Sequence, residues 1–97
     1  MKTTQEVVSI LRQARPQLSR RFGVTRLALF GSYARGEQRD ESDVDVLVEA
    51  EPSIGLRFVD LADEIETLLG IRTEVVSRRA ISPAHWVLIE KELLDVA

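Results

Sequence analysis

Apolar residues in the N-terminal part of the chain recur with helical spacing. Over residues 7–22 they return every three or four positions, which predicts an amphipathic helix. Thr3 and Glu6 form a capping-box pattern at its start, and Gly23 follows as a predicted C-cap. Pro16 lies inside this segment. Because proline lacks a backbone N–H, we expect it to kink or divide the helix.

Three later segments have the patterns of strands. Residues 27–30 form a continuous apolar run that stops at a Gly-Ser pair, residues 44–48 alternate valine with other residues, and residues 73–76 are mostly β-branched. Ser32 is expected to cap a short helix directly after the first strand. The polar residues 36–42 that follow predict a loop.

Two further helices complete the predicted order. One spans residues 56–69 and ends at Gly70, and the last begins with Ser82 as its N-cap and runs to about Leu94. Three strands among these helices predict an α/β or α+β fold, with a small sheet of three strands or slightly more. The apolar stripes expected to be buried are Leu56, Val59, Ala62, Ile65, Leu68 and Leu69 in the first helix, and Trp86, Ile89 and Leu93 in the second.

Length and composition restrict the class of protein. The chain has 97 residues, 44% of them apolar and 30% charged, which is typical of one globular domain spanning residues 1–97. It has no cysteine, which excludes a disulfide scaffold and a thiolate metal site. Its apolar runs are too short to span a membrane, so we expect a cytoplasmic protein without a membrane partner.

The net charge of −3 hides two oppositely charged segments. Residues 12–39 carry seven arginines and one acid, a local charge of +6, whereas residues 40–66 carry ten acids and one arginine, a local charge of −9. The basic segment has no interleaved aromatic residues and the whole chain is acidic, so direct nucleic-acid binding is not expected. The sign of the charge reverses in the predicted loop, which directs attention to residues 36–42.

Two acids at the start of the second predicted strand are candidate metal ligands. Asp43 and Asp45 are two residues apart, so their side chains are expected on the same face of the strand. Two carboxylates held close together repel each other unless a cation lies between them, and carboxylate oxygens suit Mg²⁺. The spacing alone favours a solvent-facing acidic pair over a metal site.

The Gly-Ser pair after the first strand is a candidate phosphate site. A strand that ends at Gly31 and Ser32 and leads into a helix presents free backbone N–H groups and a hydroxyl at the positive end of the helix. Arg35 and Arg39 can add charge-assisted contacts to phosphate oxygens. An ordinary serine cap explains this turn by itself, but it does not explain the acidic pair that follows so closely.

Together these residues resemble a known signature. Gly31-Ser32, ten further residues and then Asp43-x-Asp45 form the pattern of the polymerase-beta-like nucleotidyltransferase superfamily. The wider residues 27–37 and 42–49 look like the minimal nucleotidyltransferases (MNT), usually encoded beside a HEPN-domain partner as a toxin–antitoxin pair. The resemblance covers nearly the whole chain and implies the polymerase-beta-like fold.

The resemblance also implies an activity. Gly31 and Ser32 would hold the terminal phosphates of ATP, and Asp43 and Asp45 would bind two Mg²⁺ ions. The reaction would be the transfer of AMP to a hydroxyl of a partner protein, a HEPN toxin, with release of pyrophosphate. The chain would then be a protein adenylyltransferase and an antitoxin. The small domain also leaves surface for self-association.

The third carboxylate of the family departs from the usual pattern. The family commonly has an aspartate on the third strand, where this chain has Glu74. Glutamate keeps the charge, so Glu74 is expected to be a metal ligand and the general base for the acceptor hydroxyl. The change leaves open a non-catalytic antitoxin that binds nucleotide and neutralises its partner by contact. Transfer to a small molecule is less favoured, because related enzymes add a domain for the acceptor.

Overall fold

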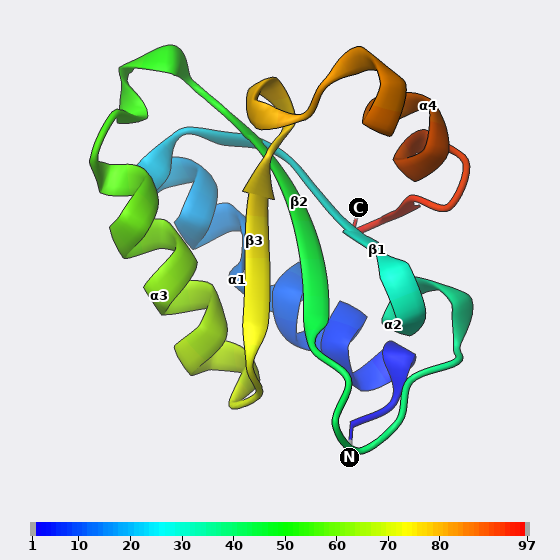
Figure 1. Cartoon of the computed structure of the whole chain (residues 1–97). Helices are drawn as coiled ribbons and strands as arrows, with labels where there is room; N and C mark the ends of the chain where they lie inside the picture. The colour runs from blue at the N-terminus through cyan, green and yellow to red at the C-terminus, as the bar shows by residue number, and fades with distance from the viewer. Residues whose placement is uncertain (1, 97) are drawn as a thin grey trace.

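A four-stranded sheet with the order β3-β2-β1-β4 forms the centre of the computed structural model, which describes residues 2–96 (Figure 1). β1 runs antiparallel to both β2 and β4, and β3 runs parallel to β2. The predicted small mixed sheet with flanking helices is therefore confirmed. Met1 and Ala97, the ends of the predicted domain, lie outside the described residues. The strands are β1 (Val24–Phe30), β2 (Val44–Ala50), β3 (Thr73–Ser77) and β4 (Leu94–Asp95).

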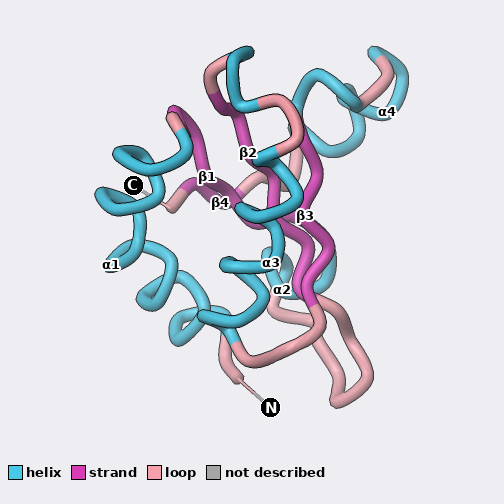
Figure 2. The backbone as a smooth tube through the Cα atoms, turned by 90° about the vertical axis from the view of Figure 1, so that its left-hand side faces the viewer, coloured by secondary structure: helices cyan, strands magenta, loops and turns pink. Residues whose placement is uncertain are grey.

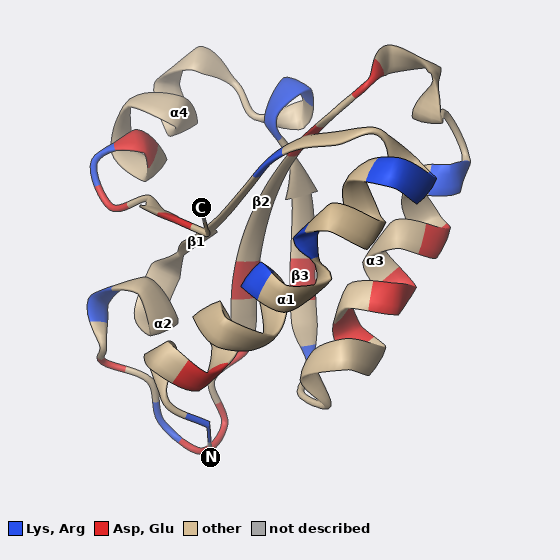
Figure 3. Cartoon of the chain, turned by 180° about the vertical axis from the view of Figure 1, so that it is seen from behind, with Lys and Arg blue, Asp and Glu red and all other residues tan. Residues whose placement is uncertain are grey.

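Two long helices, α1 (Thr4–Phe22) and α3 (Arg57–Leu69), pack against each other and against the sheet (Figure 2). The alternation in β2 explains this layer, because its valines point into the core while the residues between them face the opposite side. The basic α1 and the acidic α3 are linked by an ion pair between Arg21 and Glu64. The charge asymmetry in the sequence is thus partly a contact between two helices (Figure 3).

The start and end of α1 match the prediction, but its middle does not. Thr3 and Glu6 form the capping box, and Gly23 ends the helix in a left-handed conformation. The expected division at Pro16 is wrong, because α1 continues through it as one helix of 19 residues. Proline removes one backbone hydrogen bond, and burial of apolar side chains on both sides of it offsets that loss. The buried side chains of α1 are Val7, Val8, Leu11, Leu18 and Phe22.

The buried stripe of α3 also differs from the expected one. Leu56, Val59 and Leu68 are 93%, 61% and 41% exposed, so the prediction that they are buried is wrong. The helix begins at Arg57, and Ile65 and Leu69 are buried as expected. Leu61, which was not predicted, completes the buried stripe, because residues four apart lie on the same side of a helix. That stripe consists of Leu61, Ile65 and Leu69.

The C-terminal segment folds differently from the prediction. Helix α4 (Pro83–Glu90) begins at the expected Ser82 cap but ends at Glu90 rather than about Leu94. None of its residues is buried, so the expected buried stripe is wrong, because no other layer covers this helix. The chain then turns back to form β4 beside β1, and the Val96 N–H donates to the Leu27 carbonyl at 2.9 Å.

Two short 3₁₀ helices complete the described chain, Pro52–Ile54 before α3 and Arg78–Ala80 after β3. Arg78 lies over the ring of Trp86, with its guanidinium carbon 3.9 Å from the ring centroid, and this contact holds α4 beside the end of β3. Among residues 2–96, no helix has both the length and the apolar character needed to cross a membrane.

Candidate active site

The turn from β1 into the short helix α2 (Gly31–Arg35) depends on a glycine. Gly31 has a φ of +73°, in the left-handed region, and a Cβ atom at this position would collide with Oδ2 of Asp45. Glycine thus allows the backbone to lie directly against a carboxylate of β2. The close contact with Asp45 therefore explains why the signature has a glycine at this position.

The predicted cap of α2 is one residue out of place. Ser32 lies inside the helix, and the extended residue Phe30 occupies the N-cap position without a side-chain hydrogen bond. The helix begins earlier because Gly31 turns the chain immediately after the strand. The prediction that Ser32 is the N-cap is therefore wrong, while its role toward phosphate stays a prediction.

The candidate carboxylates meet at neighbouring strands. Asp45 pairs in register with Glu74 across the parallel β2–β3 ladder and with Phe30 across the β1–β2 ladder. Figure 3 shows acidic positions at matching heights on β2 and β3. Asp43 was expected on the strand with Asp45 but lies just before β2, which begins at Val44, and its Oδ1 is 3.9 Å from Nε of Arg72. The register therefore places Asp45 between Glu74 on one side and Phe30, the residue that precedes Gly31, on the other.

The environment of Asp45 favours a cation. Burial, which is the largest cause, together with the negative charges of Glu74 and Asp43 and a hydrogen bond with Glu74, raises the pKa of Asp45 to about 6. A cation among these oxygens would relieve the repulsion, so the donor set fits Mg²⁺ in charge and in ligand type. Within residues 2–96, however, no three acidic or histidine side chains already converge as a complete metal site. The carboxylates would have to draw together around an ion.

The raised pKa of Asp45 gives a prediction for stability. A carboxyl group with a higher pKa in the folded chain binds its proton more tightly there, so its ionisation opposes folding. We expect this group to reduce stability as pH rises from about 4 to about 6, between its ordinary pKa of 3.8 and its raised value. Thermal unfolding of metal-free wild type and Asp45→Asn across this range should show the variant gaining stability relative to wild type. Parallel curves would contradict the environment described for Asp45.

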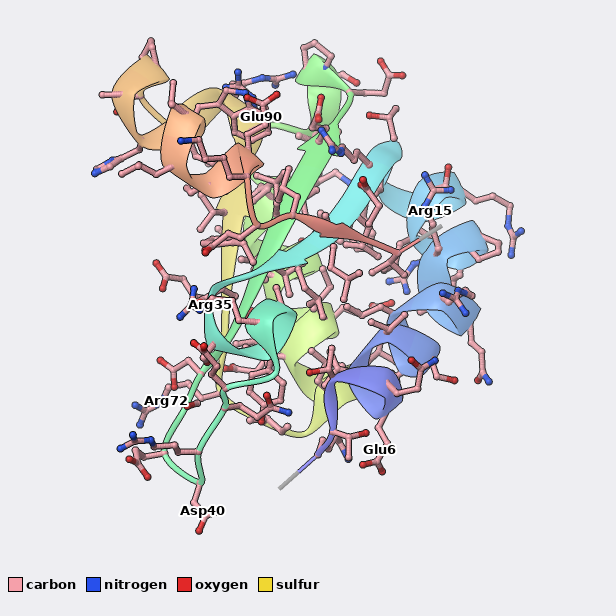
Figure 4. The ribbon with its side chains drawn as sticks, turned by 90° about the vertical axis from the view of Figure 1, so that its right-hand side faces the viewer. Glu6, Arg15, Arg35, Asp40, Arg72 and Glu90 are labelled. Carbon is pink, nitrogen blue, oxygen red and sulfur yellow. The ribbon has the colours of Figure 1, made fainter. Side chains whose placement is uncertain are left out.

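A cavity of about 290 Å³ lies beside Asp43, and neither Asp45 nor Glu74 lines it. Asp43 and Arg72 line it together with the loop that leads into β2 and the turn after α3. Figure 4 shows Arg72 on the same side of the molecule as Arg35, with Asp40 at the tip of the loop. The cavity provides open space next to one of the three candidate metal ligands, Asp43.

The two candidate phosphate-binding arginines lie in different places. Arg35 faces the C-terminal segment, and its guanidinium donates to Glu37 Oε1 at 2.8 Å and to Glu92 Oε2 at 2.9 Å. Arg39 lies in the exposed loop, where its backbone N–H donates to Ser42 Oγ, and it forms no ion pair within residues 2–96. The structure brings Arg35 to the candidate site but leaves Arg39 at its edge.

Sequence reasoning missed Glu92 at this site. Its Oε1 accepts the Gly31 backbone N–H at 3.0 Å, and its Oε2 accepts from Arg35. The sequence prediction placed Glu92 inside the last helix, whereas it lies in the turn between α4 and β4. The apolar-polar-apolar alternation of residues 94–96 is the only local signal of the returning strand, and it is very short.

Known proteins resemble this chain in sequence and in fold. The sequence model of the nucleotidyltransferase domain family matches residues 11–96. The chain is 43% identical to the protein adenylyltransferase MntA of Thermococcus cleftensis, over 99% of this chain and 98% of that protein. A solved structure described as a minimal nucleotidyltransferase superposes with a TM-score of 0.81 at 35% identity, covering 96% of this chain and 95% of the other.

A more distant solved structure shares the fold. It is a complex of a tri-AMPylated Shewanella oneidensis HEPN toxin with an MNT antitoxin, and it matches with a TM-score of 0.56 at 18% identity. The match covers 97% of this chain and 68% of the other.

Proposed function

The chain belongs to the nucleotidyltransferase domain family, and from this we propose that it transfers AMP from ATP to a hydroxyl group of a partner protein. Membership confirms the sequence prediction of a nucleotidyltransferase enzyme of the minimal type. The observation that carries the finer proposal is the close approach of the Gly31 backbone to the Asp45 carboxylate. The Gly31 amide and the Arg35 guanidinium are brought together as donors to one carboxylate, that of Glu92.

Each half of this site has a separate task in the proposed reaction. The Gly31 amide, Ser32 and Arg35 would bind the terminal phosphates. Arg39 lies in the neighbouring loop, and its long side chain would reach the same phosphates. Asp43, Asp45 and Glu74 would hold two Mg²⁺ ions, which when bound would neutralise negative charge on the phosphates. The arrangement would align the nucleotide next to the acceptor, and positioning is the main source of catalysis in phosphoryl transfer.

The proposed transfer forms one bond to phosphorus and breaks another. The acceptor hydroxyl oxygen forms a bond to the α-phosphorus of ATP, and the bond from that phosphorus to the β-phosphate oxygen breaks. Pyrophosphate leaves, and Glu74 accepts the hydroxyl proton. Glu74 is exposed and pairs with Asp45 in register, so it can face an acceptor that approaches from solvent.

The exposed apolar residues support a protein as the acceptor. Val87 and Leu88 on α4 are 53% and 65% exposed, and Leu56 at the start of α3 is 93% exposed. Apolar side chains left open in this way are typical of surfaces that bind another protein. The relative found in a complex with a HEPN toxin makes a HEPN-domain toxin the partner that we propose, with this chain as the antitoxin.

The proposal is tested by weighing the partner. We expect incubation of the purified chain with MgATP and the HEPN protein encoded beside it to add one or more AMP units to the partner's mass. Omitting ATP is the control. An unchanged mass, with the partner still inhibited, would contradict the enzyme and favour the second candidate function, a non-catalytic antitoxin. The contact of Glu92 with the Gly31 amide favours that second candidate, because this contact takes a group that the phosphates need.

A further inference from the structure

The carboxylate of Glu92 makes two contacts with groups that the proposed nucleotide site requires. One oxygen accepts the Gly31 N–H at 3.0 Å, and the other accepts from the Arg35 guanidinium at 2.9 Å. A carboxylate that bridges a backbone amide and an arginine makes the same kinds of contact as a phosphate group. Glu92 therefore occupies the place where the phosphates are proposed to bind.

We propose that Glu92 is an internal competitor for the nucleotide phosphates, and that it determines how tightly this chain binds ATP. This inference rests on the proposed function, because it concerns the same phosphate site. ATP would bind only after the Glu92 side chain turns away from Gly31 and Arg35. The carboxylate and the triphosphate are both anions, so the two cannot share these donors without repulsion.

The backbone around Glu92 holds it in this place. Its N–H donates to the Ile89 carbonyl at 3.0 Å, and two residues later the chain enters β4, where Leu94 pairs with Leu29. The side chain is 30% exposed, so it has open solvent into which it can turn. Displacement thus needs a side-chain rotation but no unfolding of the C-terminal segment.

Arg35 remains supported when Glu92 leaves. Its Nε is also bound to Glu37 at 2.8 Å, a contact from the neighbouring loop that the C-terminal segment does not provide. Removal of Glu92 therefore frees one face of the guanidinium while Glu37 keeps the side chain oriented. This predicts tighter phosphate binding without Glu92, rather than a disordered site.

The test measures nucleotide affinity by calorimetry, with a non-hydrolysable ATP analogue in the presence of Mg²⁺. We expect Glu92→Ala to bind it roughly tenfold more tightly than wild type, because one charge-assisted competitor is removed. Glu92→Gln should lie between the two, since it loses the charge but keeps an acceptor oxygen. Glu90→Ala is the matched control, because Glu90 is exposed at the end of α4 (Figure 4) and should leave the affinity unchanged.

A second measurement detects the contact itself. Hydrogen exchange at the Gly31 amide should be faster in Glu92→Ala than in wild type, and binding of the analogue should slow it again. Adenosine, which carries no phosphate, should bind wild type and Glu92→Ala equally.

Two failures can be told apart. Equal or weaker binding of the analogue by folded Glu92→Ala, while wild type binds, would overturn the competition and leave the proposed function intact. Absence of binding by wild type and by every variant would overturn both.

Discussion

Replacing Asp43 and Asp45 together by asparagine is expected to lower AMP transfer to the partner by about a thousandfold or more. Both residues border the acidic edge of β2, and burial together with the negative charges of Glu74 and Asp43 already raises the pKa of Asp45. Asparagine keeps the size of each side chain but removes the charge that would hold a cation against the nucleotide phosphates. The loss should therefore concern catalysis rather than folding.

The fold of this double variant gives the control. Because ionised Asp45 opposes folding, we expect its thermal midpoint near pH 7, without metal, to equal or exceed that of wild type. Asp40→Asn is the matched substitution, since Asp40 lies in the neighbouring loop outside the proposed ligand set. Mass spectrometry of the partner measures transfer for all three proteins. Substantial transfer by the double variant, or an equal loss in Asp40→Asn, would contradict the proposed role of the pair.

The second large effect is expected for Gly31→Ala. Gly31 and Gly36 have nearly the same backbone, with φ of +73° and +71°, so alanine costs each about 1–2 kcal/mol of stability. At Gly36 no atom lies within 4 Å of the added methyl group, whereas at Gly31 the methyl group collides with Asp45. Overpacking of this kind adds about 1–3 kcal/mol, and it moves a proposed catalytic carboxylate.

Comparison of the two alanine variants separates the two causes. Urea unfolding should show Gly36→Ala less stable than wild type and Gly31→Ala less stable still. Transfer should be nearly abolished in Gly31→Ala at a temperature where both variants are folded, and largely kept in Gly36→Ala. Equal stability and equal activity of the two variants would show that the close approach to Asp45 has no importance.

Much of the fold could be predicted because its signals are local. The capping box at Thr3 and Glu6, the left-handed Gly23 and the alternation in residues 44–48 each determine the structure of the residues that carry them. The Gly31–Asp45 signature indicated the superfamily, and the wider residues 27–37 and 42–49 indicated the minimal nucleotidyltransferases. These are features that a few consecutive residues specify without help from the rest of the chain.

The wrong structural predictions concern segments whose conformation depends on contacts with distant parts of the chain. Helix α1 tolerates Pro16 because the core holds both of its halves. Leu56 and Val59 fit a helical stripe with Ile65, yet they are exposed and Leu61 is buried beside Ile65. The strand at Leu94 forms only because β1 has a free edge to pair with.

The candidate site shows the same division. The strand register sets Asp45 opposite Glu74, and this follows from parallel pairing that no local pattern specifies. Glu92 reaches Gly31 only because the chain turns back after α4, 61 residues further along the sequence. The residues of the signature could therefore be identified from the sequence, whereas Glu92, which contacts the proposed phosphate-binding groups of Gly31 and Arg35, could not.

The central claim is that the α-phosphate of ATP, with its adenosine, passes to the partner protein. The most direct measurement uses ATP labelled in parallel reactions at the α- or the γ-phosphate, followed by isolation of the partner. We predict that the α label remains on the partner and that the γ label is released as pyrophosphate. A partner that carries the γ label, or neither label, would contradict the claim.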